Sequence, residues 1–209
     1  MKVHRWKTII ALAAAAGLAL AIGAAPSQAA TLVDSAKASA GSSASDLSKL
    51  PLTDRHLTRH EKANLAVVLR DYHVAEGTSL DVPTFVNSFT KGGVFNDVVA
   101  GQTYQGPALG EVLNNMVGIL PDVHRDLKQI TVHGDVISIE LSIQGTFNGS
   151  LPTPAGTLKG NGARVDVPTA DFWYLHNGKV ERFNCFVGYS VFFSQMGVNW
   201  DWATAVGSH

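Results

Sequence analysis

The 209-residue chain has one cysteine, few charged residues and no acidic residue before Asp34. The single cysteine, Cys185, excludes an intrachain disulfide, so stability must come from a packed core. It lies in the stretch Phe183-Asn-Cys-Phe-Val, which favours a small buried hydrophobic residue over a nucleophile. Residues 1–30 contain three of the 16 basic residues, leaving 13 basic against 17 acidic residues and a net charge of −4. Binding to phosphate backbones needs a positively charged surface, which a chain with this net negative charge is not expected to have, so we expect no nucleic-acid partner.

Residues 1–30 have the composition of a secretory signal peptide. Lys2, Arg5 and Lys7 precede an uncharged run that starts at Thr8, and small residues around Ala29 offer a cleavage site. The alternative is a retained membrane anchor, because the run approaches the length that spans a bilayer. We expect cleavage, a secreted or periplasmic location, and no stable membrane anchor afterwards.

The rest of the chain divides by composition. Residues 31–56 are rich in Ala and Ser and nearly lack large apolar side chains, which predicts a flexible tether. Residues 57–198 have the size of one domain, and residues 199–209 form a C-terminal tail. Trp200 and Trp202 in this tail could dock on the domain or stay free of it.

Helical patterns come first in the domain and strand patterns follow. Thr58 and Glu61 form the S/T-x-x-E spacing of a capping box, so the first helix begins there and ends by Gly77. Further helices are expected after Asp81 and from Gly106 to Leu120, with a short strand or bend at 94–99 between them. Strands are expected at 127–132, 136–147, 163–167 and 171–175. Asn177-Gly178 predicts a type I′ hairpin, and this order of elements indicates an α+β fold.

The order of these pieces resembles the NTF2-like superfamily, in its SnoaL-like polyketide cyclase and ketosteroid isomerase branch, over roughly residues 60–198. The motifs that carry the resemblance are Ala75-Glu-Gly, Phe85-x-x-x-Phe89, Val94-Phe-Asn-Asp, Thr103-Tyr-Gln-Gly-Pro, Leu120-Pro-Asp and the stretch 170–181. The resemblance implies an NTF2-like cone, in which three N-terminal helices pack on a strongly curved antiparallel sheet around an apolar pocket, usually in a dimer. Members of this superfamily include enzymes, binding modules and scaffolds, so the fold alone does not assign chemistry.

Two aspartates match the catalytic positions of ketosteroid isomerase-like enzymes. By this resemblance Asp97 is the base that shuttles a proton, and Asp171 is the acid that stays protonated and binds the developing oxyanion. Two carboxyls in an apolar cavity can divide these roles because burial keeps one of them neutral. The simpler readings remain open: Asp97 as a turn former that bonds its own backbone, and Asp171 as a solvated residue at a strand entry.

The last strand departs from the cyclase pattern. SnoaL-like cyclases commonly carry a His-Trp pair there and an acidic residue shortly after, whereas this chain has Phe183-Asn184 and then Gly188. The departure puts cyclase chemistry in doubt and leaves the isomerase-like pair intact. Tyr72 lies two residues closer to Gly77 than the isomerase pattern requires, so it faces the pocket from another turn or belongs to the core.

The expected substrate-binding residues are Tyr72, Phe95, Trp173 and Asn184, and we expect neither a metal nor a cofactor. Period-two alternation puts Asp171 and Trp173 on one face, and Phe172 and Tyr174 on the other. A sheet that is apolar on both faces must be covered on both, which predicts a homodimer through the outer face. Two functions stay open: proton transfer next to a carbonyl of a small apolar substrate, and non-catalytic binding of a small molecule or protein partner.

Overall fold

The computed structural model describes residues 47–198 and 201–207. The predicted signal peptide, residues 31–46 of the predicted tether and Trp200 lie outside the described residues. Across the described ranges, no helix combines the length and the apolar character needed to cross a membrane.

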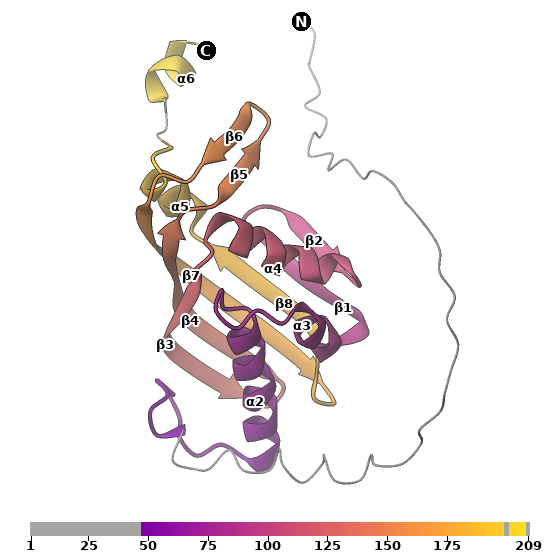
Figure 1. Ribbon diagram of the computed structural model, residues 1–209. Helices are drawn as coiled ribbons and strands as arrows, with labels where there is room; N and C mark the ends of the chain where they lie inside the picture. The colour runs from indigo at the N-terminus through magenta and orange to yellow at the C-terminus, as the bar shows by residue number, and fades with distance from the viewer. Residues whose placement is uncertain (1–46, 199–200, 208–209) are drawn as a thin grey trace, which may run out of the picture. The chain divides into compact units, whose positions relative to one another are not determined.

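The centre of the fold is a six-stranded sheet in the order β2-β1-β8-β7-β4-β3, beside a separate two-stranded β5-β6 hairpin (Figure 1). Neighbouring strands of the large sheet are antiparallel except β1 and β8, which pair in parallel. The strands are β1 (Phe89–Asp97), β2 (Gln102–Gln105), β3 (His124–His133), β4 (Val136–Phe147), β5 (Ser150–Thr153), β6 (Gly156–Lys159), β7 (Ala163–His176) and β8 (Lys179–Val187).

Some of the described helices pack on one face of this sheet (Figure 1), and others come after its last strand in the sequence. The helices are α2 (Arg59–Val74), α3 (Val82–Ser88), α4 (Ala108–Ile119), α5 (Tyr189–Gln195) and α6 (Trp202–Gly207). In Figure 1, α2, α3 and α4 lie in front of the sheet. The expected set of three N-terminal helices needs correction, because α4 follows β1 and β2, and because α5 and α6 come after the last strand. The expected wholly antiparallel sheet is likewise corrected by the parallel β1–β8 pair.

Local chemistry explains where several elements begin and turn. The Thr58 hydroxyl accepts from the Glu61 N–H at 3.2 Å, and a Glu61 carboxylate oxygen accepts from the Thr58 N–H at 2.9 Å, which confirms the capping box. Asp81 caps α3 by accepting from the Thr84 N–H at 3.1 Å. Asn177 and Gly178 have φ angles of 50° and 71°, which confirms the β7–β8 hairpin expected from this dipeptide.

Residues 47–56, the described part of the predicted tether, contact the domain. Leu52 forms a parallel bridge with Ile130 on β3, and the Thr53 N–H donates to the Ile130 carbonyl at 2.9 Å. Leu47 and Leu50 pack against the core together with Leu52. These leucines are spaced among the polar residues of the predicted tether. Within the described residues, apolar contacts with the domain core therefore begin at residue 47.

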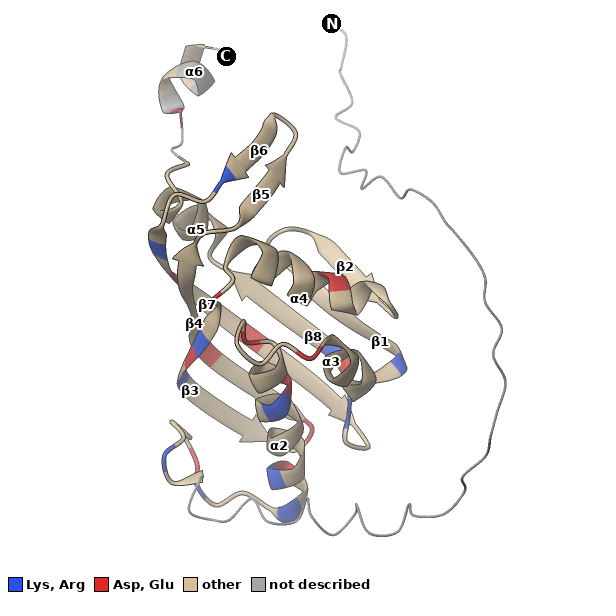
Figure 2. Ribbon diagram, in the orientation of Figure 1, with Lys and Arg blue, Asp and Glu red and all other residues tan. Residues whose placement is uncertain are grey.

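The central strands of the sheet bury the side chains of one face and leave apolar side chains on the other. Along β7, Asp171 and Trp173 are buried and Phe172 and Tyr174 are half-buried, as period-two alternation predicts. On β8, Phe186 points to the outer face and is 37% exposed. Figure 2 shows the Lys and Arg positions, coloured blue on the ribbon, spread over several elements.

Candidate active site

Three polar side chains form a row across the buried face of the sheet. Cys185 on β8 is the register partner of Asp97 on β1 and also of Asp171 on β7. Adjacent strands lie about 4.8 Å apart, so the two aspartate Cα atoms are about 10 Å apart with the thiol between them. Strand pairing therefore brings together two acids that are 74 positions apart in the sequence.

Both acids line one internal cavity of about 60 Å³ between the helices and the sheet. Most of its wall is apolar or aromatic. The lining comprises Asp71, Tyr72, Ala75, Phe85, Phe95, Asp97, Val112, Leu113, Met116, Arg125, Ile143, Asp171, Trp173, Phe183, Cys185, Val187 and Tyr189. A volume of this size holds roughly five water-sized groups, which limits an occupant of this conformation to a very small molecule.

Asp171 is almost entirely buried and accepts a hydrogen bond from helix α2. It is 3% exposed, and the Tyr72 hydroxyl donates to its Oδ2 at 2.7 Å. Trp173 Nε1 donates to the Tyr72 oxygen at 3.0 Å, so these three side chains form a chain of bonds. Burial raises the pKa of Asp171 to about 6, although Tyr72 and Cys185 beside it lower the pKa. Its Oδ1 has no hydrogen-bond partner among the described residues.

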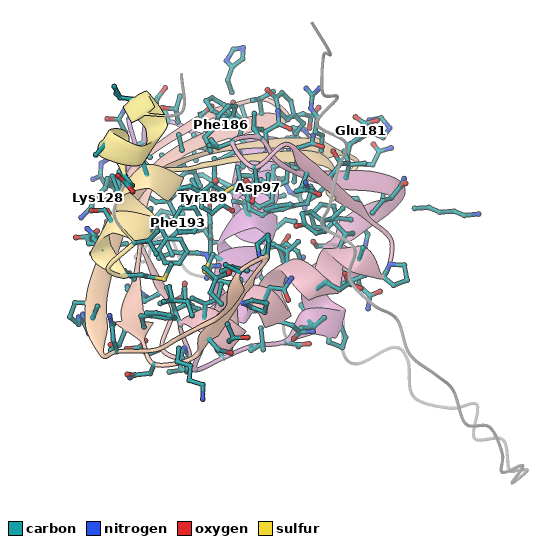
Figure 3. The ribbon with its side chains drawn as sticks, turned by 90° about the horizontal axis from the view of Figure 1, so that it is seen from above. Asp97, Lys128, Glu181, Phe186, Tyr189 and Phe193 are labelled. Carbon is teal, nitrogen blue, oxygen red and sulfur yellow. The ribbon has the colours of Figure 1, made fainter. Side chains whose placement is uncertain are left out.

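Asp97 sits where β1 ends and uses its two oxygens differently. Its Oδ1 accepts from the Ala100 N–H at 3.3 Å, which is the turn-forming contact, while its Oδ2 accepts from the Tyr189 hydroxyl. Figure 3 shows Tyr189 reaching toward Asp97 from the start of α5. Asp97 is 9% exposed and faces the cavity, so it serves the turn and the cavity at once.

An aromatic wall stands beside the two acids. The Trp173 ring stacks on Phe183 with centroids 3.6 Å apart, and Phe95 meets Phe183 edge-on at 4.7 Å. Trp173 also meets Tyr72 edge-on at 5.5 Å. These rings keep water from the side of the cavity next to Asp171, which is the physical cause of its raised pKa.

Five of the six predicted site side chains line the cavity: Asp97, Asp171, Phe95, Trp173 and Tyr72. The place of Tyr72 on α2 directs its hydroxyl onto Asp171. Asn184 does not line the cavity. It lies between two inward-facing residues of β8, so alternation turns it to the other face, where its Oδ1 accepts from Asn96 Nδ2 at 2.8 Å.

Two charged side chains in the cavity wall were not expected from the sequence. Asp71 on α2 is fully buried, and burial raises its pKa to about 6; Ser88 Oγ donates to its Oδ2 at 2.5 Å, and Arg70 lies 3.6 Å from its Oδ1. Arg125 on β3 is largely buried, with Nη1 donating to the Ala75 carbonyl at 2.7 Å and lying 3.7 Å from Glu76. No sequence motif marks either residue, because both are placed by packing alone.

Asp171 should make the protein less stable as the pH rises. Its pKa is about 6 when folded against an ordinary value of 3.8, so the contribution of Asp171 to stability is full below about pH 3.8 and is lost as the pH rises through about 6. The loss amounts to about 3 kcal/mol at most. Urea unfolding of the wild type and of Asp171→Asn at about pH 4 and about pH 7.5 measures it, and the wild type should lose more stability than the variant. Equal pH dependence in both proteins would contradict this assignment.

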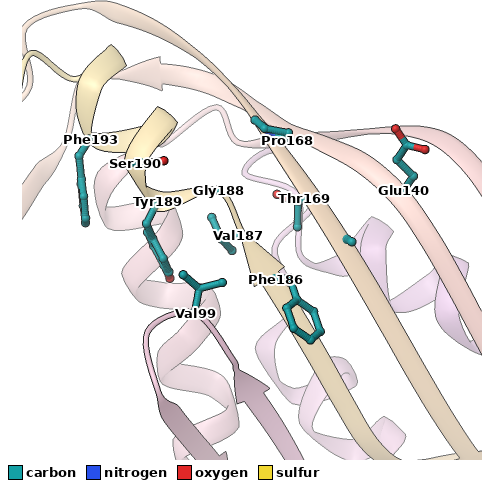
Figure 4. A pocket seen from close by; sticks show the side chains of 11 residues that line it. Val99, Glu140, Pro168, Thr169, Phe186, Val187, Gly188, Tyr189, Ser190 and Phe193 are labelled. Carbon is teal, nitrogen blue, oxygen red and sulfur yellow. The ribbon is translucent and has the colours of Figure 1, made fainter.

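A second, open hollow lies on the outer side of the sheet (Figure 4). It has a volume of about 800 Å³ and is mostly apolar, with Phe186, Val99 and Phe193 among the residues that line it. Tyr189 and Val187 line both this groove and the internal cavity, so they form the partition between the two.

No protein-family model matches the chain, and no curated protein matches it in sequence. Solved structures do match it. A protein from Jannaschia sp. CCS1 classed as a SnoaL-like polyketide cyclase is 19% identical, with a TM-score of 0.60 over 70% of this chain and 100% of that one. A protein from Bacillus cereus ATCC 10987 classed as a polyketide cyclase is 18% identical, with a TM-score of 0.58 over 73% of this chain and 94% of that one.

A third similar structure belongs to the isomerase side of this group. It is a protein with a ketosteroid isomerase-like fold from Catenulispora acidiphila DSM 44928, solved in complex with trimethylamine. It is 18% identical, with a TM-score of 0.52 over 64% of this chain and 96% of that one. The chain therefore has the NTF2-like fold that SnoaL-like polyketide cyclases and ketosteroid isomerase-like proteins share.

Proposed function

We propose that the protein catalyses proton transfer at the carbon next to a carbonyl group of a small apolar substrate. The observation that carries the proposal is that Asp97 and Asp171 line the same buried cavity in unlike surroundings. One carboxyl lies at the end of a strand beside a turn, and the other lies behind an aromatic wall. Unlike environments for two carboxyls are what an acid and a base at one pH require.

In this reaction Asp97 takes the proton from the carbon and Asp171 stabilises the enolate oxygen. The protonated form of Asp171 can carry its hydrogen on Oδ1, because Oδ2 already accepts from Tyr72. A hydrogen bond from Oδ1 then reaches the oxygen on which negative charge develops. Asp97 either returns the proton to a neighbouring carbon, which is an isomerisation, or first exchanges it with water and then returns a solvent proton to the same carbon, which is an exchange with solvent. Trp173 and Phe95 exclude water around the substrate.

The size of the cavity restricts the substrate. Sites for molecules of drug size have volumes of roughly 300–1,000 Å³, well above the 60 Å³ found here. A polyketide or a steroid does not fit this conformation. The missing last-strand acid of the cyclase pattern points the same way, so we infer a short ketone or aldehyde in place of a fused-ring substrate.

The direct test is exchange of the methyl hydrogens of acetone in deuterated water, followed by proton NMR. Acetone suits the small cavity and has exchangeable hydrogens next to its carbonyl. The wild-type protein should accelerate exchange above the buffer rate, with the Asp126→Asn variant as a matched control, because Asp126 is exposed and pairs with Lys128 on β3. Exchange no faster than with heat-unfolded protein would count against the proposal.

The second candidate is a non-catalytic module that holds a small molecule in the same cavity. It is favoured by the departure at 183–188 from the cyclase pattern and predicts binding that survives substitution of both acids. In either role we propose export, which the signal-like composition of residues 1–30 supports.

We also infer that two copies associate through the outer face of the sheet. Phe186, Val98 and Val99 are exposed there, and the open groove beside them is mostly apolar. Light scattering at micromolar concentration should give the mass of a dimer, and Phe186→Glu should give a monomer because it places a charge in that contact. A monomeric wild type at that concentration would rule the dimer out.

A further inference from the structure

Cys185 lies between the two proposed catalytic acids and has no role in the proposed reaction. Cys185 pairs in register with both Asp97 and Asp171, lines the cavity and is 6% exposed. Its surroundings differ from those of a buried apolar residue, since it is flanked on both sides by carboxyls. Valine or alanine would fill the same space without a polar hydrogen.

A separate observation is that one oxygen of the Asp171 carboxyl lacks a hydrogen-bond donor among the described residues. This oxygen is Oδ1, and the carboxyl is buried. Burying an unpaired carboxylate oxygen is costly, so such an atom calls for a donor from a neighbour or a ligand. Cys185 is the register partner of Asp171 on the neighbouring strand and lowers the pKa of this carboxyl, and an S–H group is a weak donor.

The thiol is suited to this task because it keeps its hydrogen. Burial and the nearby Asp171 raise the pKa of Cys185 well above its usual range, and Asp97 adds to the effect. The raised pKa favours the protonated thiol, which keeps the hydrogen that a donor needs.

We propose that Cys185 is a positioning residue, whose S–H group donates to Asp171 Oδ1 while that carboxyl is ionised and gives up the contact when Oδ1 takes a proton and donates to the substrate oxygen. The inference builds on the proposed function, because it assigns the group that holds Oδ1 in place before Asp171 is protonated and the substrate arrives. A weak donor suits this position. It stabilises the unpaired oxygen in the empty cavity, and its contact is lost at little cost when Oδ1 takes the proton.

Variants at position 185 that differ in donor strength test the proposal. Cys185→Ser supplies a stronger donor, and Cys185→Ala supplies none. The readout is the carboxyl carbon-13 shift of Asp171 against pH, assigned by its loss in Asp171→Asn. The other titratable or charged groups near this carboxyl are Tyr72 on α2, Arg125 on β3 and Asp97 on β1, and they are the same in every variant.

We expect the proton affinity of Asp171 to rise about threefold in Cys185→Ala and to fall about threefold in Cys185→Ser, with the wild type between them. Cys185→Val, which also lacks a donor but fills the space, should follow Cys185→Ala and takes its place if that variant does not fold. A packing role alone would change the free energy of unfolding with side-chain volume and leave the Asp171 pKa unchanged. Equal pKa values in the Ser variant and the donor-free variant would overturn the proposal.

This readout needs no substrate, so it separates the inference from the proposed function. If the pKa values follow donor strength and acetone exchange is absent, the thiol holds Asp171 and the assigned reaction is wrong. If exchange occurs, its pH profile should move in the same direction as the Asp171 pKa across the variants.

Discussion

An Asp97→Asn variant should exchange the hydrogens of acetone about 10²–10⁴-fold more slowly than the wild type. The amide has nearly the shape of the carboxylate, so its oxygen can still accept from Ala100 or Tyr189. It cannot take a proton from carbon, because an amide oxygen is far too weak a base. The exchange rate is read by proton NMR at saturating acetone.

The same variant must stay folded for the rate to be informative. Replacement of one accepting oxygen should change the free energy of unfolding by no more than about 1.5 kcal/mol, the usual worth of one hydrogen bond. Urea unfolding of both proteins measures this. A variant that unfolds like the wild type and exchanges acetone at the wild-type rate would remove Asp97 from the mechanism.

A Trp173→Ala variant should lose about 3–5 kcal/mol of unfolding free energy. Trp173 is 1% exposed, stacks on Phe183 and donates to the Tyr72 oxygen, so its removal opens a void and takes away the donor to that buried oxygen. Both effects add to the lost transfer of an indole ring from water. Urea unfolding followed by circular dichroism measures the loss.

Phe172→Ala is the matched control on the adjacent position of β7. Phe172 is half-buried on the outer face and touches Phe186, so its loss should cost about 1 kcal/mol. Both variants should be compared at one protein concentration, since the outer face is the inferred dimer contact. Similar losses for the two variants would mean that the inner aromatic wall is not the main packing centre near the acids.

Local sequence chemistry predicted the elements whose stabilising contacts lie close in the chain. The capping box at Thr58 and the turn at Asn177-Gly178 each depend on residues within a few positions, and both are present. The strand 136–147 was also found at its predicted bounds, because alternation persists over its whole length. The two predicted strands after residue 163 are one continuous strand, since Pro168 is accommodated within β7.

Features that depend on distant partners were not predictable in this way. The parallel pairing of β1 with β8 joins residues almost ninety positions apart, for example Asn96 with Asn184. Helix α5 has no side-chain cap, and its sequence Tyr189–Gln195 is rich in aromatic and branched residues that suit strands equally well. Its position makes Tyr189 a partner of Asp97, which no motif indicated.

For the site, alternation predicted that Asp171 and Trp173 share a face, and the resemblance supplied Asp97. Neither could show that Cys185 lies between the acids, because that depends on the register of three strands at once. Asn184 was expected in the cavity but lies on the other face of the sheet. A shift of one position along a strand reverses the face to which a side chain points. The sequence reading of Cys185 as a buried residue is confirmed.

The parallel β1–β8 pair also bears on the order in which the chain can fold during synthesis. On its other side β1 has only the short strand β2, so most of its partners come from β8, the last strand to leave the ribosome. Asp97 consequently gains Cys185 and Tyr189 as neighbours only when translation of the domain is almost complete. A shortened chain that ends before Lys179 would hold β3, β4 and β7 as a meander, with β1 paired to β2 alone.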